Sequence, residues 1–371
     1  MSSQELYLHL CPLDHTLHSH YRHSITSNMS KLIVVVGITG NQGGSVADAF
    51  LSDSSWRIRA ITRDPSKPSA KEWASRGVEL VQGDMDDVTS LTKAFTGATA
   101  IFAMTDYWFP LFDPKVRVEA EQKGMPPNQL CAELETQRAK NLARAAAAPE
   151  VQKTLERYVY SSLPHCFLLS GGKYTKIWHF DSKAVAEKWI REDPEMQKAG
   201  LSAKASFVHV GLYTDNWTRS TLEICKAKEG DGYYHLDITD GRVKQPFVWT
   251  RRDTGPLVKK LVEDLHPGTR LVAMSESATY REFMAKWAKV GGKKLAGDGG
   301  IKQLSEEEYR DTLPGDEHIK EHLTQCWQWA RDFGYNGGDK DSVFPEDVGM
   351  AGAMTSLEDY FKQEDWSTFE N

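Results

Sequence analysis

The sequence has few cysteines and no long apolar run. Its five cysteines among 371 residues lie far apart, with no C-x-x-C pair, which fits neither a disulfide framework nor the spacing of a zinc ribbon. No stretch approaches the roughly 20 apolar residues that a membrane-spanning helix needs. We therefore expect a soluble protein of a reducing compartment, cytoplasmic with the nucleus as the alternative, without membrane association and without a metal site.

The chain also lacks a strong excess of one charge. Its net charge is −7, and charged residues make up 26% of the total. Nucleic-acid-binding proteins usually carry a dense basic surface, so we do not expect direct nucleic-acid binding. The length suits one large α/β domain with a smaller appended part.

Residues 1–30 lack the features of a targeting signal. They contain no long hydrophobic region, a single arginine and the acidic residues Glu5 and Asp14, a composition typical of neither a secretory nor a mitochondrial leader. Five histidines lie here at irregular spacing. This pattern favours a flexible extension over a metal site.

The motif that organises the chain is a strand followed by glycines at residues 31–50. The β-branched run Leu32 to Val36 predicts a buried strand, and Gly37, Gly40 and Gly43 follow before an amphipathic segment. Glycine allows positive φ and the close approach of a pyrophosphate, whose charge the N-terminus of the next helix stabilises. The motif indicates a dinucleotide site, although a tight strand-to-helix turn in any α/β domain can carry such glycines.

Strands and helices alternate beyond this turn. Further strands are predicted at residues 56–63, 78–82, 98–104, 156–162, 205–210 and 270–274. Helices at the intervening segments make a doubly wound parallel sheet the predicted fold, with ligands at the carboxyl ends of its strands. The four prolines of residues 109–128 predict an irregular loop, either a lid or a passive surface segment.

Arg63 lies at the end of the second predicted strand, about twenty residues beyond the last glycine of the turn. In dinucleotide folds this place holds an acidic residue for a ribose 2′-OH or an arginine for a 2′-phosphate. Arg63, with Lys67 behind it, therefore favours NADP(H) over NAD. The alternative is a solvated basic edge.

A second chemical signal lies at residues 171–184. A helix is predicted from Asp181, with Asp181 or Ser182 as its N-cap and Lys183 in its first turn. A lysine there can reach a ribose hydroxyl or the nicotinamide, although an exposed first-turn lysine is common.

The second half of the sequence is predicted to contain both strands and helices. Strand-like pieces are predicted at 232–236 and 245–249, and helices at 253–265, 279–290, 317–333 and 357–363, with a further helix starting at 305 and a loose connection at 334–354. Trp327, Trp329 and Phe333 are predicted core residues, with contact to a planar substrate as the alternative.

The chain resembles the NmrA-like family of atypical short-chain dehydrogenase/reductases, the HSCARG type, which is abundant in fungi. The matching segments cover residues 31 to about 330: GITGNQGGSV at 37–46, ITRDPSKPSAK at 61–71, VELVQGDMDD at 78–87, MTDYW at 104–108, GKYTKIWHFDSKA at 172–184 and LYTDN at 212–216. The resemblance implies a Rossmann-type domain that binds NADP(H) and a smaller mixed α/β C-terminal domain that closes a cleft over it.

Domain boundaries follow from this resemblance and from the element pattern. We expect a flexible extension at 1–30, the NADP-binding domain at 31–215 with parts of 245–275, a substrate or partner domain at 216–335, and a C-terminal tail with a short helix at 336–371.

The resemblance also implies roles for the residues that match the family's motifs. The pyrophosphate would lie on Gly37, Ile38, Thr39, Gly40, Asn41, Gln42 and Gly43, the 2′-phosphate on Arg63 and Lys67, and the adenine near Asp84 and Met85; Thr105, Asp106 and Tyr107 would line the path to the nicotinamide, Lys183 would contact its ribose, and Tyr213, Thr214, Asp215 and Asn216 would close its end.

The catalytic pattern departs from that of active dehydrogenases, which carry a tyrosine four residues before the lysine to deliver a proton alongside hydride transfer. His179 stands at that position. A histidine can donate a proton near neutral pH, and Tyr174, Tyr107 or Tyr213 could substitute in space. A helix that starts at Asp181 would, however, leave His179 outside it.

Two functions therefore remain open. One is an NADP-dependent oxidoreductase of a small organic substrate such as a secondary metabolite. The other is a catalytically weak NADP(H) redox sensor that regulates a protein partner such as a transcription factor. The sequence supports no prediction of the oligomeric state.

Overall fold

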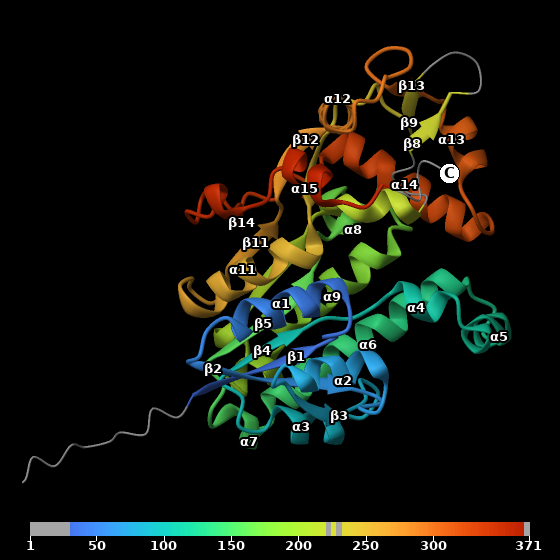
Figure 1. The fold of residues 1–371 in the computed structure, drawn as a ribbon. Helices are drawn as coiled ribbons and strands as arrows, with labels where there is room; N and C mark the ends of the chain where they lie inside the picture. Colours follow the sequence, from blue (N-terminus) through green and yellow to red (C-terminus); the bar gives the residue numbers. More distant parts are fainter. Residues whose placement is uncertain (1–29, 220–223, 228–231, 367–371) are drawn as a thin grey trace, which may run out of the picture.

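The computed structural model describes residues 30–219, 224–227 and 232–366 (Figure 1). The prediction of a flexible extension at residues 1–30 lies almost entirely outside these ranges. No helix within them is long and apolar enough to cross a membrane.

A parallel sheet of eight strands forms the centre of the molecule, in the order β14-β11-β6-β5-β4-β1-β2-β3. The strands are β1 (Lys31–Val36), β2 (Trp56–Thr62), β3 (Glu79–Gln82), β4 (Ala100–Ala103), β5 (Arg157–Ser162), β6 (Ala205–Val210), β11 (Arg270–Ala273) and β14 (Ser342–Val343). The strand order reverses between β1 and β4, which is the topological switch point of a Rossmann-type fold. The predicted doubly wound parallel sheet is confirmed.

Helices bury both faces of this sheet. Leu32, Val34 and Val36 of β1 pack with α3, α6 and α9, whereas Ile33 and Val35 pack on the opposite face with α1, α2 and α11. The continuous apolar run of β1 follows from this two-sided burial. The helices are α1 (Asn41–Leu51), α2 (Pro68–Ser75), α3 (Val88–Phe95), α6 (Pro127–Ala147), α9 (Trp178–Glu192) and α11 (Thr250–Glu263).

The segment predicted to be an irregular loop at 109–128 is instead helical. It contains α4 (Trp108–Leu111), α5 (Pro114–Gln122) and the start of α6, and α4 and α5 lie at the right of Figure 1. Pro114 and Pro127 are the first residues of their helices. Proline fits there because the first helical residue needs no amide hydrogen for the helix, so the prolines mark helix starts.

A smaller part of the molecule contains two mixed sheets, in the orders β12-β10-β7 and β13-β9-β8. Its strands are β7 (Leu212–Tyr213), β8 (Ile224–Lys226), β9 (Tyr233–Asp237), β10 (Lys244–Val248), β12 (Glu276–Thr279) and β13 (Ile301–Gln303). Its helices are α12 (Tyr280–Gly291), α13 (Glu306–Thr312), α14 (Glu317–Phe333) and α15 (Leu357–Gln363). Phe247, Phe283 and Phe361 lie in its core.

The stretch 334–354 differs from the predicted loose connection. β14 pairs in parallel with β11, and Val348, Met350 and Met354 pack against the core under the central sheet. The glycines of this stretch supply turns around those contacts. The remaining short elements are α7 (Pro149–Gln152), α8 (Cys166–Leu169), α10 (Pro194–Lys198), η1 (Ser202–Lys204), η2 (Thr214–Arg219) and η3 (Ala351–Ala353).

The contact between α1 and α11 depends on Gly255. Its amide donates a hydrogen bond of 2.8 Å to Ser45 Oγ, and a Cβ atom at this position would lie 2.0 Å from the carbonyl oxygen of Ser45. We expect Gly255→Ala to lower the free energy of unfolding by about 2 kcal/mol or more, since backbone atoms cannot yield as a side chain would. Gly352→Ala, where a Cβ meets nothing within 4 Å, is the control in urea unfolding. Equal stability of the two variants would contradict the prediction.

Candidate functional site

The glycine turn between β1 and α1 has the shape of an anion-binding turn. Gly37 has φ of +76°, and a Cβ atom at Gly43 would lie 2.3 Å from the carbonyl oxygen of Gly37, so both positions require glycine. Gly40 is the N-cap of α1, and no side chain of the described chain caps its first turn. The first amides of α1 are therefore available to an anion, where the helix dipole favours negative charge.

Side chains from three other elements hold the start of α1. Gln42 Nε2 donates a hydrogen bond of 2.7 Å to the hydroxyl of Tyr213 at the end of β7, and Gln42 Oε1 accepts one of 2.6 Å from Ser161 at the end of β5. Asn41 Nδ2 donates to Asp215 Oδ2 at 3.3 Å. The turn, which the family resemblance assigned to the pyrophosphate, and residues 213–215, which it assigned to the nicotinamide end, are thus in direct contact.

Arg63 directly follows β2, where the sequence predicted a residue for a 2′-phosphate. Its side chain is exposed, as is that of Lys67, the N-cap of α2. The guanidinium carbon of Arg63 lies 5.5 Å from the ring centroid of Phe109 on α4, a cation–π distance. The 104–128 segment therefore reaches the same end of the sheet.

Asp84 and Met85 follow β3 at the neighbouring strand end. Asp84 is exposed and accepts a hydrogen bond from the amide of Asp86, and the carbonyl of Met85 accepts one of 2.9 Å from Asn141 on α6. The backbone of this loop is thus fixed to the helix beside it, while the Asp84 side chain stays at the surface.

Thr105, Asp106 and Tyr107 follow β4 and differ in their surroundings. Asp106 is exposed and accepts hydrogen bonds from the amides of Trp108 and Phe109, at 2.9 and 3.1 Å. Tyr107 is buried, and its hydroxyl donates to the carbonyl of Asn128 at 3.1 Å. Burial also raises the pKa of Tyr107, which disfavours this tyrosine as a proton donor.

Lys183 forms a buried ion pair with Glu135 of α6. Glu135 is 1% exposed and also accepts hydrogen bonds from Thr105 Oγ1, at 2.8 Å, and from Ser182 Oγ. Lys183 Nζ additionally lies 3.4 Å from the carbonyl oxygen of Thr105. Lys183 is therefore neither exposed nor in the first turn of its helix, because α9 begins at Trp178, before the predicted start at Asp181.

The early start of α9 places His179 inside the helix, four residues before Lys183 and so on the same face. The expectation that His179 lies outside the helix is wrong. His179 Nδ1 lies 2.6 Å from His322 Nε2 of α14, and the two rings stack with centroids 4.8 Å apart. Burial, His322 and Lys183 together hold the pKa of His179 well below its usual value, and burial lowers the pKa of His322 to about 3. Both rings are neutral at pH 7, which disfavours His179 as a general acid.

Tyr174 is held away from this pair of histidines. Its hydroxyl donates a hydrogen bond of 2.6 Å to Asp332 Oδ2 on α14, and its ring meets Trp329 edge-on, with the centroids 6.4 Å apart. None of its hydrogen bonds or ring contacts in the described structure reaches Lys183 or His179.

The segment at the end of β7 contains the remaining predicted site residues. Thr214 Oγ1 donates a hydrogen bond to the carbonyl of Val248, and Asn216 lies in η2.

The sequence analysis missed Glu135, His322, Cys326 and Asp332. Two of these carry a signal in the helical pattern: Glu135 is in phase with the buried residues Cys131, Ala139 and Leu142 of α6, and His322 is in phase with Ile319 and Trp329 of α14. A polar residue on an apolar helix face is unusual unless it has a partner. Asp332 has no such signal, because it lies near the end of its helix.

Comparison with known proteins identifies the family of this chain. The model of the NmrA-like family matches residues 29–370. The chain belongs to the NmrA-like family. An NmrA-like oxidoreductase of Aspergillus campestris, cpsB, is 39% identical over 284 residues, which cover 73% of this chain and 76% of that protein. The oxidoreductase notA of an Aspergillus species is also 39% identical, over 68% of this chain and 71% of that protein.

Solved structures share the fold of this NmrA-like chain. NmrA, a negative transcriptional regulator crystallised with NADP, aligns with a TM-score of 0.67 at 19% identity, over 90% of this chain and 95% of that one. The Citrobacter triphenylmethane reductase in complex with NADP(H) aligns with a TM-score of 0.61 at 19% identity, over 90% of this chain and 99% of that one. Both comparisons establish the Rossmann-type fold.

The Tyr174–Asp332 contact predicts a pH-dependent stability. Burial raises the pKa of Asp332, but hydrogen bonds from Arg331, Lys173 and Tyr174 outweigh burial and hold the pKa below its usual value. A carboxyl with a depressed pKa stabilises the fold above its unfolded pKa of about 3.9, and this stabilisation is lost as the pH falls further.

We expect Asp332→Asn to lower the free energy of unfolding by about 1 kcal/mol at pH 7, because Asp332 is exposed and solvent screens its ionic contacts, and the difference from wild type to shrink as the pH falls below about 4. Urea unfolding at a series of pH values measures both effects. Asp311→Asn, at an exposed position of α13, is the control. A stability difference that is constant from pH 7 to pH 3 would show that the carboxylate charge contributes nothing.

Proposed function

We propose that this NmrA-like protein is an NADP(H)-dependent oxidoreductase that acts on a small organic substrate. The observation that carries the proposal is the meeting of the glycine turn, Arg63 and the Lys183–Glu135 pair at the carboxyl edge of one parallel sheet. This edge, beside the switch point between β1 and β4, is where doubly wound folds bind dinucleotides.

The glycine turn supports a pyrophosphate at the start of α1. Gly37 takes a backbone conformation that favours glycine, Gly43 leaves no room for a side chain, and the first turn of α1 has no side-chain cap within the described chain. Residues 37–43 would hold the two phosphates through backbone amides, which need no counter-charge from a side chain. The fit of this turn to a dinucleotide rests on these features of the chain itself.

Arg63 and Lys67 support NADP(H) over NAD(H). Both side chains are exposed beyond β2, and Arg63 has a cation–π contact with Phe109 but no ion pair within the described residues. A guanidinium binds a phosphate through two parallel hydrogen bonds. The 2′-phosphate of NADP(H) would lie against Arg63, with the adenine near Asp84 and Met85.

Lys183 supports a reaction at the nicotinamide. When bound, the cofactor supplies the hydride. The ammonium of Lys183, held by Glu135 and Thr105, would position the nicotinamide ribose, and Tyr213, hydrogen-bonded to Gln42, would close the site from the opposite side. Oxidoreductases among the relatives of similar length, such as cpsB, also favour an enzyme.

A redox sensor is the second candidate, and one observation favours it. His179 occupies the position of the proton-donating tyrosine, its protonation is suppressed by burial, and the hydroxyls of Tyr107 and Tyr174 are engaged by Asn128 and Asp332. A chain that binds NADP(H) without an available proton donor could report the redox state to a protein partner. NmrA, which shares this fold and was crystallised with NADP, is a transcriptional regulator.

We expect Arg63→Ala to weaken NADPH binding by about 10- to 100-fold, the loss of one charge-assisted contact, and to leave NADH binding unchanged. Calorimetric titration of both cofactors checks this expectation. Arg57→Ala is the matched control, because Arg57 is an exposed arginine of β2, the strand that Arg63 follows. Tight binding of NADH to the wild type, or an unchanged preference in Arg63→Ala, would contradict the NADP(H) assignment.

Lys183 is tested by NADPH consumption against a panel of carbonyl, imine and alkene substrates. Removing Lys183 alone would leave Glu135 buried without its partner, so the variant is Lys183→Met combined with Glu135→Leu, which removes both charges. We expect kcat/KM to fall by about 100-fold or more, whereas Lys188→Met, an exposed lysine of α9, keeps wild-type activity. If the wild type consumes no NADPH with any substrate of the panel, and captures a protein partner in a manner that depends on NADP(H), the redox-sensor function would be favoured.

A further inference from the structure

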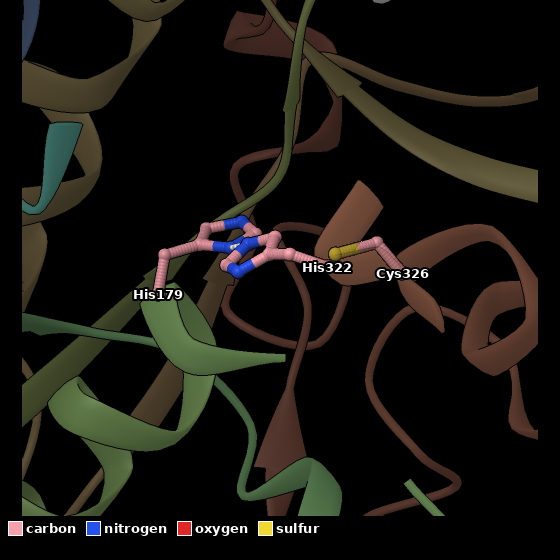
Figure 2. Close-up of side chains that lie close together, drawn as sticks. All are labelled: His179, His322 and Cys326. Atoms are coloured by element: carbon pink, nitrogen blue, oxygen red, sulfur yellow. Dashed lines mark hydrogen bonds between the residues drawn. The ribbon is translucent and has the colours of Figure 1, made fainter. Parts of the chain in front are cut away.

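Three side chains outside the assigned cofactor contacts converge between α9 and α14. His179 comes from the first turn of α9, and His322 and Cys326 come from successive turns of α14 (Figure 2). One ligand atom from each of the three lies within 4.8 Å of the other two. Figure 2 shows the two imidazole rings overlapping, with the sulfur of Cys326 directed toward His322.

We propose that His179, His322 and Cys326 form a three-ligand site for a divalent transition-metal ion of the zinc class. This proposal goes beyond the oxidoreductase assignment and does not depend on it. It also revises the expectation from sequence, which found no metal motif because the three ligands are divided between two distant helices.

The donor set matches this class of ion. Imidazole nitrogen and cysteine sulfur are the ligands that Zn²⁺ prefers, and Cys and His combinations with three protein ligands keep a fourth position for water or a substrate oxygen. His322 and Cys326 are four residues apart on one helix, so both side chains project from the same face, as in helical zinc motifs.

The distances are close to those of a tetrahedral site. Zn–N bonds of about 2.05 Å and Zn–S bonds of about 2.3 Å place two nitrogens about 3.3 Å apart and nitrogen and sulfur about 3.6 Å apart. The two nitrogens lie 2.6 Å apart here, and no pair in the cluster exceeds 4.8 Å. Side-chain rotations that part the two nitrogens by about 0.7 Å and bring the sulfur nearer by at most about 1.2 Å would complete the geometry.

One nitrogen of the cluster has no hydrogen-bond partner among the described residues. His322 is fully buried, and its Nδ1 has no hydrogen-bond partner within the described residues. Tyr107 and Trp108 cover the histidines, with ring centroids 5.5 Å from His322 and 5.0 Å from His179 respectively. Nδ1 is, however, not the nitrogen that faces His179, and an ion bound through Nε2 would leave it without a partner. The observation that points to an ion is the convergence of the three donor atoms.

The electrostatics permit a cation at this place. Lys183 is the positive neighbour of His179, but its charge is paired with Glu135. Burial and, to a smaller extent, the negative charge of Asp181 raise the pKa of the Cys326 thiol, so a bound ion would have to displace the thiol proton. A thiolate at Cys326 would lower the net charge of a bound divalent ion by one.

The test is metal binding by the full-length chain without an affinity tag. Cobalt(II) is titrated into the metal-free protein, and the thiolate-to-cobalt charge-transfer band and the visible d–d bands are recorded. Imidazole is a common ligand of transition metals, and residues 1–30 contain five histidines. Therefore the double variant His322→Gln/Cys326→Ser, which retains them, is the reference, and Cys11→Ser is the control for the charge-transfer band.

We expect the wild type and Cys11→Ser to bind one more equivalent of cobalt than the double variant, and the charge-transfer band to vanish in Cys326→Ser. Each ligand substitution should weaken zinc binding by more than about 100-fold, the upper limit for losing an outer-shell partner. Zinc should also raise the melting temperature of the wild type more than that of the double variant.

Equal cobalt stoichiometry in the wild type and the folded double variant would overturn the proposal, as would a charge-transfer band that persists in Cys326→Ser. If the variants fail to fold, X-ray absorption of the zinc-loaded wild type decides: one sulfur with two imidazole nitrogens supports the site, and a shell without sulfur refutes it. NADPH titration of the same samples separates this outcome from the cofactor proposal.

Discussion

A parallel sheet that is buried on both faces leaves only the ends of its strands for polar chemistry. The position of the candidate site depends on this constraint. β1 and its neighbours present apolar side chains to both helical layers, so groups that must meet a ligand lie where the strands end. The glycine turn, Arg63 and the segment after β4 all follow strands of this sheet at their carboxyl ends. The switch point between β1 and β4 separates the helices there and makes room for a dinucleotide.

Burial of charge at this edge requires paired partners. Glu135 satisfies three donors, from Lys183, Ser182 and Thr105, and thereby joins α6, α9 and the end of β4. A lone buried charge would be strongly destabilising, whereas a fully satisfied set fixes the position of each member. His179 and His322 extend the same polar region to α14, which brings the C-terminal part of the chain to the candidate site. Cys326 lies one turn further along that helix.

Much of the fold could be predicted from local patterns. The helix at 317–333 and the final helix at 357–363 have the predicted bounds, because their apolar periodicity and their Asp316 and Ser356 caps act within a few residues. The start of α9 was misplaced for the opposite reason. Its N-cap, Ile177, provides no side-chain cap, and the buried Phe180 packs with Trp329 and Tyr174 instead. Tertiary packing, which leaves no signal in the local sequence, therefore determines where that helix starts.

The sequence by itself determined the Rossmann-type sheet, the glycine turn and the place of Arg63, since β-branched runs, glycines and strand ends act over short distances. Only the tertiary structure decided which polar groups meet. Lys183 pairs with Glu135 across 48 residues, His179 meets His322 across 143, and Tyr174 bonds Asp332 across 158. Such pairs depend on how helices pack around the sheet, and local periodicity does not encode which faces come together.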